Sequence, residues 1–184
     1  MTGHPWLYDP TKTTYLGVRA QQLWTDLVIW EKFFQEQPIK SVIELGTLKG
    51  GMSLFLLAQC MQRGIEFWTM DMNTEPDDTP VAQALGLKRR FLRMNIFGDG
   101  QPWIEQMIAS TLFKPLLLFC DGGNKVAEVL TFSPMLKRDD FVVVHDWMWE
   151  IGPKNLEGQI PFLEPVYLLE CEALNSMTRF WRRL

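Results

Sequence analysis

The chain has 184 residues, of which 47% are hydrophobic, and a formal net charge of -4. This length is typical of one domain, and the apolar fraction is sufficient for a buried core, so the composition excludes a disordered chain. The 22 acidic residues outnumber the 18 basic ones, which leaves no overall positive field to attract a polyanion. We therefore expect one globular domain over residues 1–184, without a nucleic-acid partner.

Residues 1–15 are polar and interrupted by proline, and they lack the basic start and apolar stretch of a secretion signal. No apolar run approaches the roughly 20 residues that span a bilayer, so no membrane association is expected. Cys60, Cys120 and Cys171 lie far apart in apolar sequence, which fits neither a disulfide framework nor a cysteine metal site. These features predict a cytoplasmic protein with reduced thiols.

Short apolar runs that end in glycine or aspartate alternate with segments of helical spacing. This alternation is typical of a parallel sheet covered by helices. The first part of the chain predicts a helix over residues 20–35, a strand over 41–46 and a helix over 51–62.

Four further strands are predicted, at residues 66–71, 90–95, 116–121 and 141–146, with a loop at 74–80. The last two strands are continuous apolar runs, which suit central parallel strands buried on both faces.

The tail of the chain contains two more β-rich segments, residues 166–170 and 178–182. They predict an antiparallel hairpin that closes the sheet, with residues 172–177 as its connection.

A glycine-rich segment, residues 44–53, lies between the first predicted strand and the next helix. A dinucleotide-binding loop requires glycine where Leu48 stands, and a phosphate-binding loop requires lysine where Met52 precedes Ser53. The pattern E-x-G-x-x-x-G-G-x-S instead resembles the first motif of class I methyltransferases that use S-adenosylmethionine (SAM).

This resemblance assigns most of the segment to the cofactor. The residues so assigned are Glu44, Gly46, Thr47, Gly50, Gly51 and Ser53. In the resemblance, Gly46 lets the loop pass close to the methionine portion of SAM. Gly50 and Gly51 open the helix whose backbone N–H groups would meet the SAM carboxylate.

The next two strand ends offer further cofactor contacts. Asp71 ends its predicted strand about 25 residues after the loop, where a carboxylate can accept both ribose hydroxyls. Asn95 and Ile96 would hold the adenine, the amide by hydrogen bonding and the isoleucine by packing.

The resemblance becomes more specific when the flanking residues are included. The segments that carry it are 15–18, 21–22, 42–47, 50–53 and 121–124. Together they look like the rhamnosyl O-methyltransferase and cephalosporin hydroxylase family, from about residue 15 to the closing hairpin. The family resemblance implies a SAM-binding fold, a small-molecule acceptor of sugar, lipid or antibiotic type, and a divalent metal.

Asp121, His145 and Asp146 follow the two central strands and should converge in the crevice where open α/β sheets bind ligands. Asp121 would contact the cofactor as well. In metal-dependent O-methyltransferases, carboxylates at these two strand ends hold Mg²⁺, and Asp121 and Asp146 match that arrangement. His145 stands where another oxygen ligand is usual. The sequence thus leaves open Mg²⁺, a transition metal, or no metal with His145 as general base.

Other side chains near these strand ends have less specific signals. Lys125 opens the next helix, where a lysine is expected to be solvated. Residues 1–19 form a candidate lid, and the aromatic side chains could either cover the acceptor or make core and dimer contacts. The residues concerned are Trp6, Tyr8, Tyr15, Trp147, Met148 and Trp149.

We therefore predict an α/β, Rossmann-like SAM-dependent methyltransferase fold, with a mostly parallel seven-stranded sheet, helices on both faces and a C-terminal antiparallel hairpin. The expected reaction transfers a methyl group to a hydroxyl oxygen of a small molecule, with or without a divalent metal. A SAM-binding module without turnover, an N-methyltransferase and a homo-oligomer remain open alternatives. A nucleic-acid methyltransferase is disfavoured, because residues 121–124 read D-G-G-N and lack the motif of enzymes that act on flipped bases.

Overall fold

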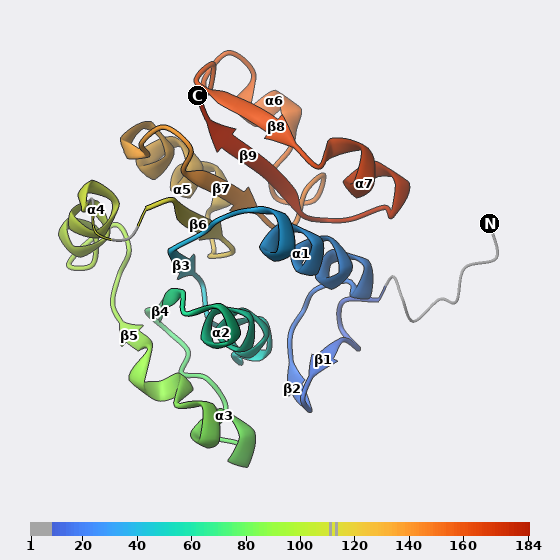
Figure 1. Ribbon diagram of the computed structural model, residues 1–184, viewed down its shortest axis with the longest axis vertical. Coiled ribbons are helices and arrows are strands. Elements are labelled where there is room, and N and C mark those ends of the chain that lie inside the picture. The colour runs from blue at the N-terminus through green and yellow to red at the C-terminus, as the bar shows by residue number, and fades with distance from the viewer. Residues whose placement is uncertain (1–8, 111, 113) are drawn as a thin grey trace.

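The computed structural model describes residues 9–110, 112 and 114–184, which are arranged around a seven-stranded sheet (Figure 1). The strands of this sheet are β3 (Ser41–Leu45), β4 (Glu66–Asp71), β5 (Phe91–Arg93), β6 (Leu116–Cys120), β7 (Phe141–Val144), β8 (Leu163–Val166) and β9 (Arg179–Arg183). Their order is β5-β4-β3-β6-β7-β9-β8. Strands β3 to β7 pair in parallel, whereas β9 is antiparallel to both β7 and β8. The predicted fold class is confirmed.

Helices cover both faces of the sheet. They are α1 (Trp24–Glu36), α2 (Gly51–Arg63), α3 (Pro80–Leu85), α4 (Gln101–Ala109), α5 (Lys125–Phe132), α6 (Pro153–Leu156) and α7 (Leu168–Ala173). Two short 3-10 turns, η2 (Leu87–Arg89) and η3 (Ser133–Met135), follow α3 and α5. Helices α1, α2, α3 and α7 contribute to the hydrophobic cluster on one face, and α4, α5 and α6 to the cluster on the other.

The sequence of strand β6 is apolar throughout, as its central position in the sheet requires. All five of its residues are buried. Leu117 and Phe119 belong to the cluster beneath α1 and α2, whereas Leu116 and Leu118 belong to the cluster beneath α4 and α5. Because successive side chains of a strand point to opposite faces, a strand between two helical layers must be apolar throughout.

The closing hairpin differs from its prediction. Strands β8 and β9 do pair antiparallel, but β8 ends at Val166, and residues 168–170 of the predicted strand begin helix α7 instead. Tyr167 adopts a left-handed conformation with φ of 58°, which ends the extended backbone. Cys171 is fully buried in the cluster beneath α1, and Lys32 of α1 donates to Glu170 at 2.6 Å. Packing against α1 therefore overrides the β-rich pattern of this segment.

Two further elements depart from the sequence expectations. Helix α3 follows the predicted loop at 74–80, because Thr79 caps it by accepting from the N–H of Ala82 at 3.2 Å and Pro80 suits the first helical turn. Helix α1 begins at Trp24 and not at residue 20, since Asp26 accepts from the N–H of Leu23 at 2.8 Å and so closes the start of the helix.

The described part of the N-terminal segment contains a small hairpin, β1 (Thr14–Tyr15) and β2 (Val18–Arg19), that packs against α2. Trp6 and Tyr8 of the predicted aromatic lid lie outside the described residues. Within the described part of the chain, no helix is both long and apolar enough to cross a membrane.

Candidate functional site

A cavity of about 620 Å³ lies at the carboxyl ends of β3, β4, β6 and β7. The strand order reverses between β3 and β6, and open α/β sheets bind ligands in the crevice at such a point. The volume is within the range of small-molecule sites. Of the residues that the sequence singled out, the cavity lining includes Gly46, Thr47, Asp71, Asp121, Lys125, His145, Asp146 and Trp149.

Asp71 lies on the cavity wall at the end of β4, and its carboxylate anchors two loops. Oδ2 accepts from the N–H groups of Thr47 and Leu48 at 3.3 and 3.0 Å. Oδ1 accepts from those of Asn73 and Thr74 at 2.8 and 2.9 Å. Asp71 therefore fixes the glycine-rich loop to the end of the second strand, and its contact with a ribose stays a prediction.

The glycines of the loop are required by the packing of the chain itself. A Cβ atom at Gly46, where φ is +98°, would lie 2.3 Å from the carbonyl oxygen of Asp121. A Cβ atom at Gly51 would lie 2.4 Å from the backbone of Arg19, and one at Gly50 would lie 2.7 Å from Pro76. Gly50 and Gly51 are buried and are not among the residues that line the cavity, and the contact of this helix start with the SAM carboxylate stays a prediction.

Glu44 and Ser53 are fully buried beneath the loop, and their expected part in holding the cofactor stays a prediction. The Ser53 hydroxyl donates to Oε2 of Glu44 at 2.5 Å. Burial raises the pKa of the Glu44 carboxyl to about 8, although the hydrogen bonds from Ser53 and Thr69 oppose the shift. Thr47 is likewise held from below, with its hydroxyl 2.5 Å from that of Thr69. These side chains support the loop from inside the protein.

Asn95 and Ile96 are not brought to the cavity. The Asn95 side-chain oxygen accepts from the N–H of Phe97 at 3.0 Å, and the backbone N–H of Asn95 donates to the Asp99 carboxylate at 2.9 Å. Ile96 packs against the cluster beneath α4 and α5. Both residues thus build the turn after β5, and their role with adenine stays a prediction.

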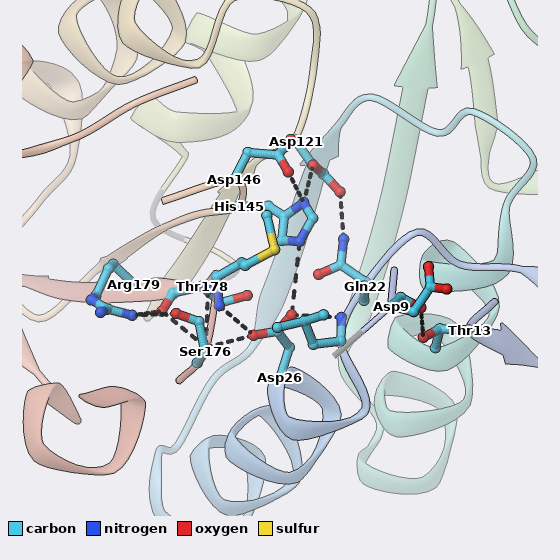
Figure 2. Close-up of polar contacts among 12 residues, drawn as sticks. Asp9, Thr13, Gln22, Asp26, Asp121, His145, Asp146, Ser176, Thr178 and Arg179 are labelled. Carbon is cyan, nitrogen blue, oxygen red and sulfur yellow. Dashed lines mark hydrogen bonds and ion pairs between the residues drawn. The ribbon is translucent and has the colours of Figure 1, made fainter. Parts of the chain in front are cut away.

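Asp121, His145 and Asp146 do converge, as predicted from the strand ends. Nδ1 of His145 lies 3.1 Å from Oδ1 of Asp121 and 3.3 Å from Oδ1 of Asp146. Asp146 adopts a left-handed conformation with φ of 57°, which aspartate tolerates better than most residues. Figure 2 shows both carboxylates on one side of the imidazole ring. They are partly exposed to the cavity, whereas His145 is buried.

The charge state of His145 is set by its acidic neighbours. Burial lowers the pKa of the imidazole, but Asp121, Asp146 and Asp26 outweigh this effect and raise it to about 10. The three carboxylates therefore favour a proton on the ring, and the role of His145 as a general base stays a prediction. A bound cation would displace that proton, as metal binding generally does.

Lys125 was expected to be solvated, but only 4% of it is exposed. Its ammonium group donates to the carbonyl of Gly122 at 2.9 Å and lies 2.8 Å from carboxylate oxygens of both Asp146 and Glu150. Burial alone would lower the pKa of Lys125, but these carboxylates and Asp121, 3.8 Å away, raise it well above its usual value. Lys125 is therefore a fixed positive charge on the cavity wall.

Two residues to which the sequence analysis gave no role orient Asp121 and the loop after it; Gln22 entered it only within segment 21–22 of the family resemblance, and Glu128 did not enter it. The buried Gln22 amide donates to Oδ2 of Asp121 at 2.9 Å. Glu128 of α5 accepts from the N–H groups of Gly122 and Asn124 at 3.2 and 3.3 Å. Glu128 follows Asn124 by four residues, about one helical turn, so its contact with this loop could have been predicted from the sequence.

The three converging residues fit a divalent cation. One ligand atom from each can be chosen so that all three lie within 4.8 Å of one another. When two ligand atoms each lie about 2.1 Å from an ion and form a right angle at it, the two atoms are about 3 Å apart. This is close to the distances of 3.1 and 3.3 Å from Nδ1 of His145 to the oxygens of Asp121 and Asp146. Two carboxylates and one imidazole are also an ordinary donor set for a divalent ion.

Comparison with known proteins identifies the fold. No family model matches the sequence, and no curated protein matches it. Among solved structures, CmcI in a form with Mg and SAM has a TM-score of 0.70, 14% identity and coverage of 95% of this chain and 77% of that one. The apo form of CmcI has a TM-score of 0.71 with the same identity and coverage.

An O-methyltransferase family protein from Burkholderia thailandensis also matches, with a TM-score of 0.54, 11% identity and coverage of 86% of this chain and 55% of that one. At such identities the likeness establishes the fold. The chain has the Rossmann-like fold of SAM-dependent methyltransferases, as the sequence motifs implied.

Proposed function

We propose that the protein is a SAM-dependent O-methyltransferase that acts on a hydroxyl group of a small molecule. The observation that carries the proposal is one cavity that combines the loop after β3 and Asp71 with the cluster of Asp121, His145 and Asp146. The first part suits a nucleoside cofactor and the second suits an acceptor oxygen.

The cofactor would lie along the carboxyl ends of β3 and β4. Gly46, Thr47 and Leu48 line this part of the cavity, and Asp71 forms its wall. SAM supplies a methyl group on a sulfonium sulfur, which an acceptor oxygen takes while its proton is released and S-adenosylhomocysteine is left. Most of the acceleration of such a transfer comes from alignment, which a rigid loop provides.

The acceptor would lie between the cofactor and the ends of β6 and β7. A divalent cation held by Asp121, His145 and Asp146 would bind the acceptor oxygen and lower the pKa of its hydroxyl. Lys125 keeps the Asp146 carboxylate in place with a 2.8 Å ion pair. Gln22 does the same for Asp121 with its 2.9 Å hydrogen bond.

The experiment measures S-adenosylhomocysteine release from SAM with catechol-like and sugar diols, with and without Mg²⁺, Mn²⁺ or Co²⁺. We expect metal-dependent release that falls at least about a hundredfold in Asp121→Asn and Asp146→Asn, because each removes a charged contact to the acceptor site. Asp78→Asn, an exposed change away from the cavity, should keep full activity. Equal activity in all four proteins would overturn the proposed acceptor site.

A SAM-binding module without turnover is the second candidate. It is favoured by the ion pairs of Lys125, which already engage Asp146 and Glu150. In that case SAM would bind, but no metal or diol would produce S-adenosylhomocysteine.

A further inference from the structure

A buried carboxylate faces the His145 ring from the side opposite to Asp121 and Asp146 (Figure 2). Oδ2 of Asp26 lies 3.8 Å from Nε2 of His145. Nε2 is buried and has no hydrogen-bond partner among the described residues. Since buried N–H groups nearly always have an acceptor, the Asp26 carboxylate, which this nitrogen faces, is the group positioned to accept from it.

Asp26 itself is held on several sides. It is fully buried near the start of α1. Oδ2 accepts from the N–H of Leu23 at 2.8 Å, and Oδ1 accepts from the Ser176 hydroxyl at 2.5 Å and the N–H of Met177 at 3.0 Å. The carboxylate therefore has a fixed position, determined by α1 and by the segment before β9.

We propose, on the basis of the proposed function, that Asp26 is a positioning residue that presents Nδ1 of His145 to a divalent cation shared with Asp121 and Asp146. A proton retained on Nε2 by Asp26 leaves the Nδ1 lone pair directed at the two carboxylates. Carboxylates that orient ligand histidines in this way commonly change metal affinity 10- to 100-fold.

The consequence is a preference for one class of metal ion. Mg²⁺ favours oxygen ligands, whereas imidazole nitrogen suits later divalent ions such as Co²⁺ and Zn²⁺. With Nδ1 of His145 fixed in the ligand set, the site should select Co²⁺ or Zn²⁺ over Mg²⁺.

The test is calorimetric titration of Co²⁺ alone and Mg²⁺ alone into the full chain. We expect the wild type to bind Co²⁺ at least about tenfold more tightly than Mg²⁺. Asp26→Asn should weaken Co²⁺ by about 10- to 100-fold and Mg²⁺ much less, so the ratio of the two affinities falls. The visible absorption of bound Co²⁺ should change with it.

Two controls separate positioning from a general loss of structure. His145→Asn removes the nitrogen ligand, so adding Asp26→Asn to it should cause no further fall in the ratio. Ser176→Ala removes another hydrogen bond to Asp26 but leaves the carboxylate facing His145, so its ratio should equal that of the wild type.

An unchanged ratio in Asp26→Asn, or an equal fall in the His145→Asn background, would overturn the inference. If Asp26→Asn does not fold, the His145→Asn variant alone provides the test. An unchanged ratio of Co²⁺ to Mg²⁺ affinity in His145→Asn would also overturn the inference. If the wild type binds neither Co²⁺ nor Mg²⁺, the inference is overturned. The proposed function is then still tested separately, by titration of SAM. Absence of SAM binding with the expected metal ratios would overturn only the methyltransferase proposal.

Discussion

The ammonium group of Lys125 lies 2.8 Å from Oδ2 of Asp146, on a lysine that is almost fully buried. Lys125 is the first residue of α5, and Asp146 lies in the loop that follows β7. Their ion pair joins the loops that follow two neighbouring strands. It thereby fixes the geometry of the acidic cluster before any ligand binds.

Lys125→Met should destabilise the protein by about 2 kcal/mol, because Asp146 and Glu150 lose their shared cation. The loss is below that of a fully buried pair because both carboxylates retain some exposure to water. Chemical denaturation measures it, with Lys154→Met on the exposed surface as control. Co²⁺ should stabilise Lys125→Met more than the wild type. An unaltered free energy of unfolding would contradict this account of Lys125.

Asp71→Asn should weaken SAM binding at least about tenfold, because the carboxylate that faces the cavity loses its charge and part of its hold on the glycine-rich loop. Calorimetric titration compares it with Asp78→Asn, an exposed change outside the cavity. Equal affinity in the two variants would remove Asp71 from the cofactor site.

Glu44 should make stability depend on pH. Its folded pKa of about 8 lies above the usual 4.5, so the folded state binds more protons than the unfolded state between these values. The free energy of unfolding should therefore fall as pH rises from about 5 to 8, by at most about 1.4 kcal/mol per pH unit from this group.

Glu44→Gln removes this contribution. Relative to the wild type, its free energy of unfolding should become larger as pH rises across that window, because the variant does not lose this contribution to stability. Urea unfolding at a series of pH values measures the difference between the two proteins, which cancels the other titrating groups. A constant difference would show that Glu44 is ionised throughout.

Gly51→Ala should destabilise the protein by about 1 to 3 kcal/mol, since the new methyl group would lie 2.4 Å from the backbone of Arg19. Gly123→Ala is the matched control, because a Cβ atom there meets nothing within 4 Å. Thermal unfolding of the two variants compares them directly. A stable Gly51→Ala would mean that the β2 backbone can move away from α2.

The sequence predicted most strands because buried parallel strands are marked by continuous apolar runs. Strand β4 has the predicted bounds, Glu66–Asp71, and β6 and β7 differ only at their ends. Helix α7 could not be predicted in this way. Its apolar residues fit a strand equally well, and only its packing against α1 decides between the two.

The candidate site was predictable where it depends on strand ends and not where it depends on distant contacts. Asp121, His145 and Asp146 follow parallel strands, so their convergence follows from topology. Gln22 reaches Asp121 across 99 residues of sequence, and Asp26 faces His145 from another element. Gln22 is part of segment 21–22, which carries the family resemblance, but no local pattern predicts its contact with Asp121 or that of Asp26 with His145.

The central claim is that the cavity binds SAM, and calorimetric titration of SAM into the wild-type protein tests it most directly. We predict saturable binding in the micromolar range with one site per chain, and competition by S-adenosylhomocysteine. An absence of binding, with or without a divalent cation, would contradict the claim and leave a methyltransferase fold with another ligand.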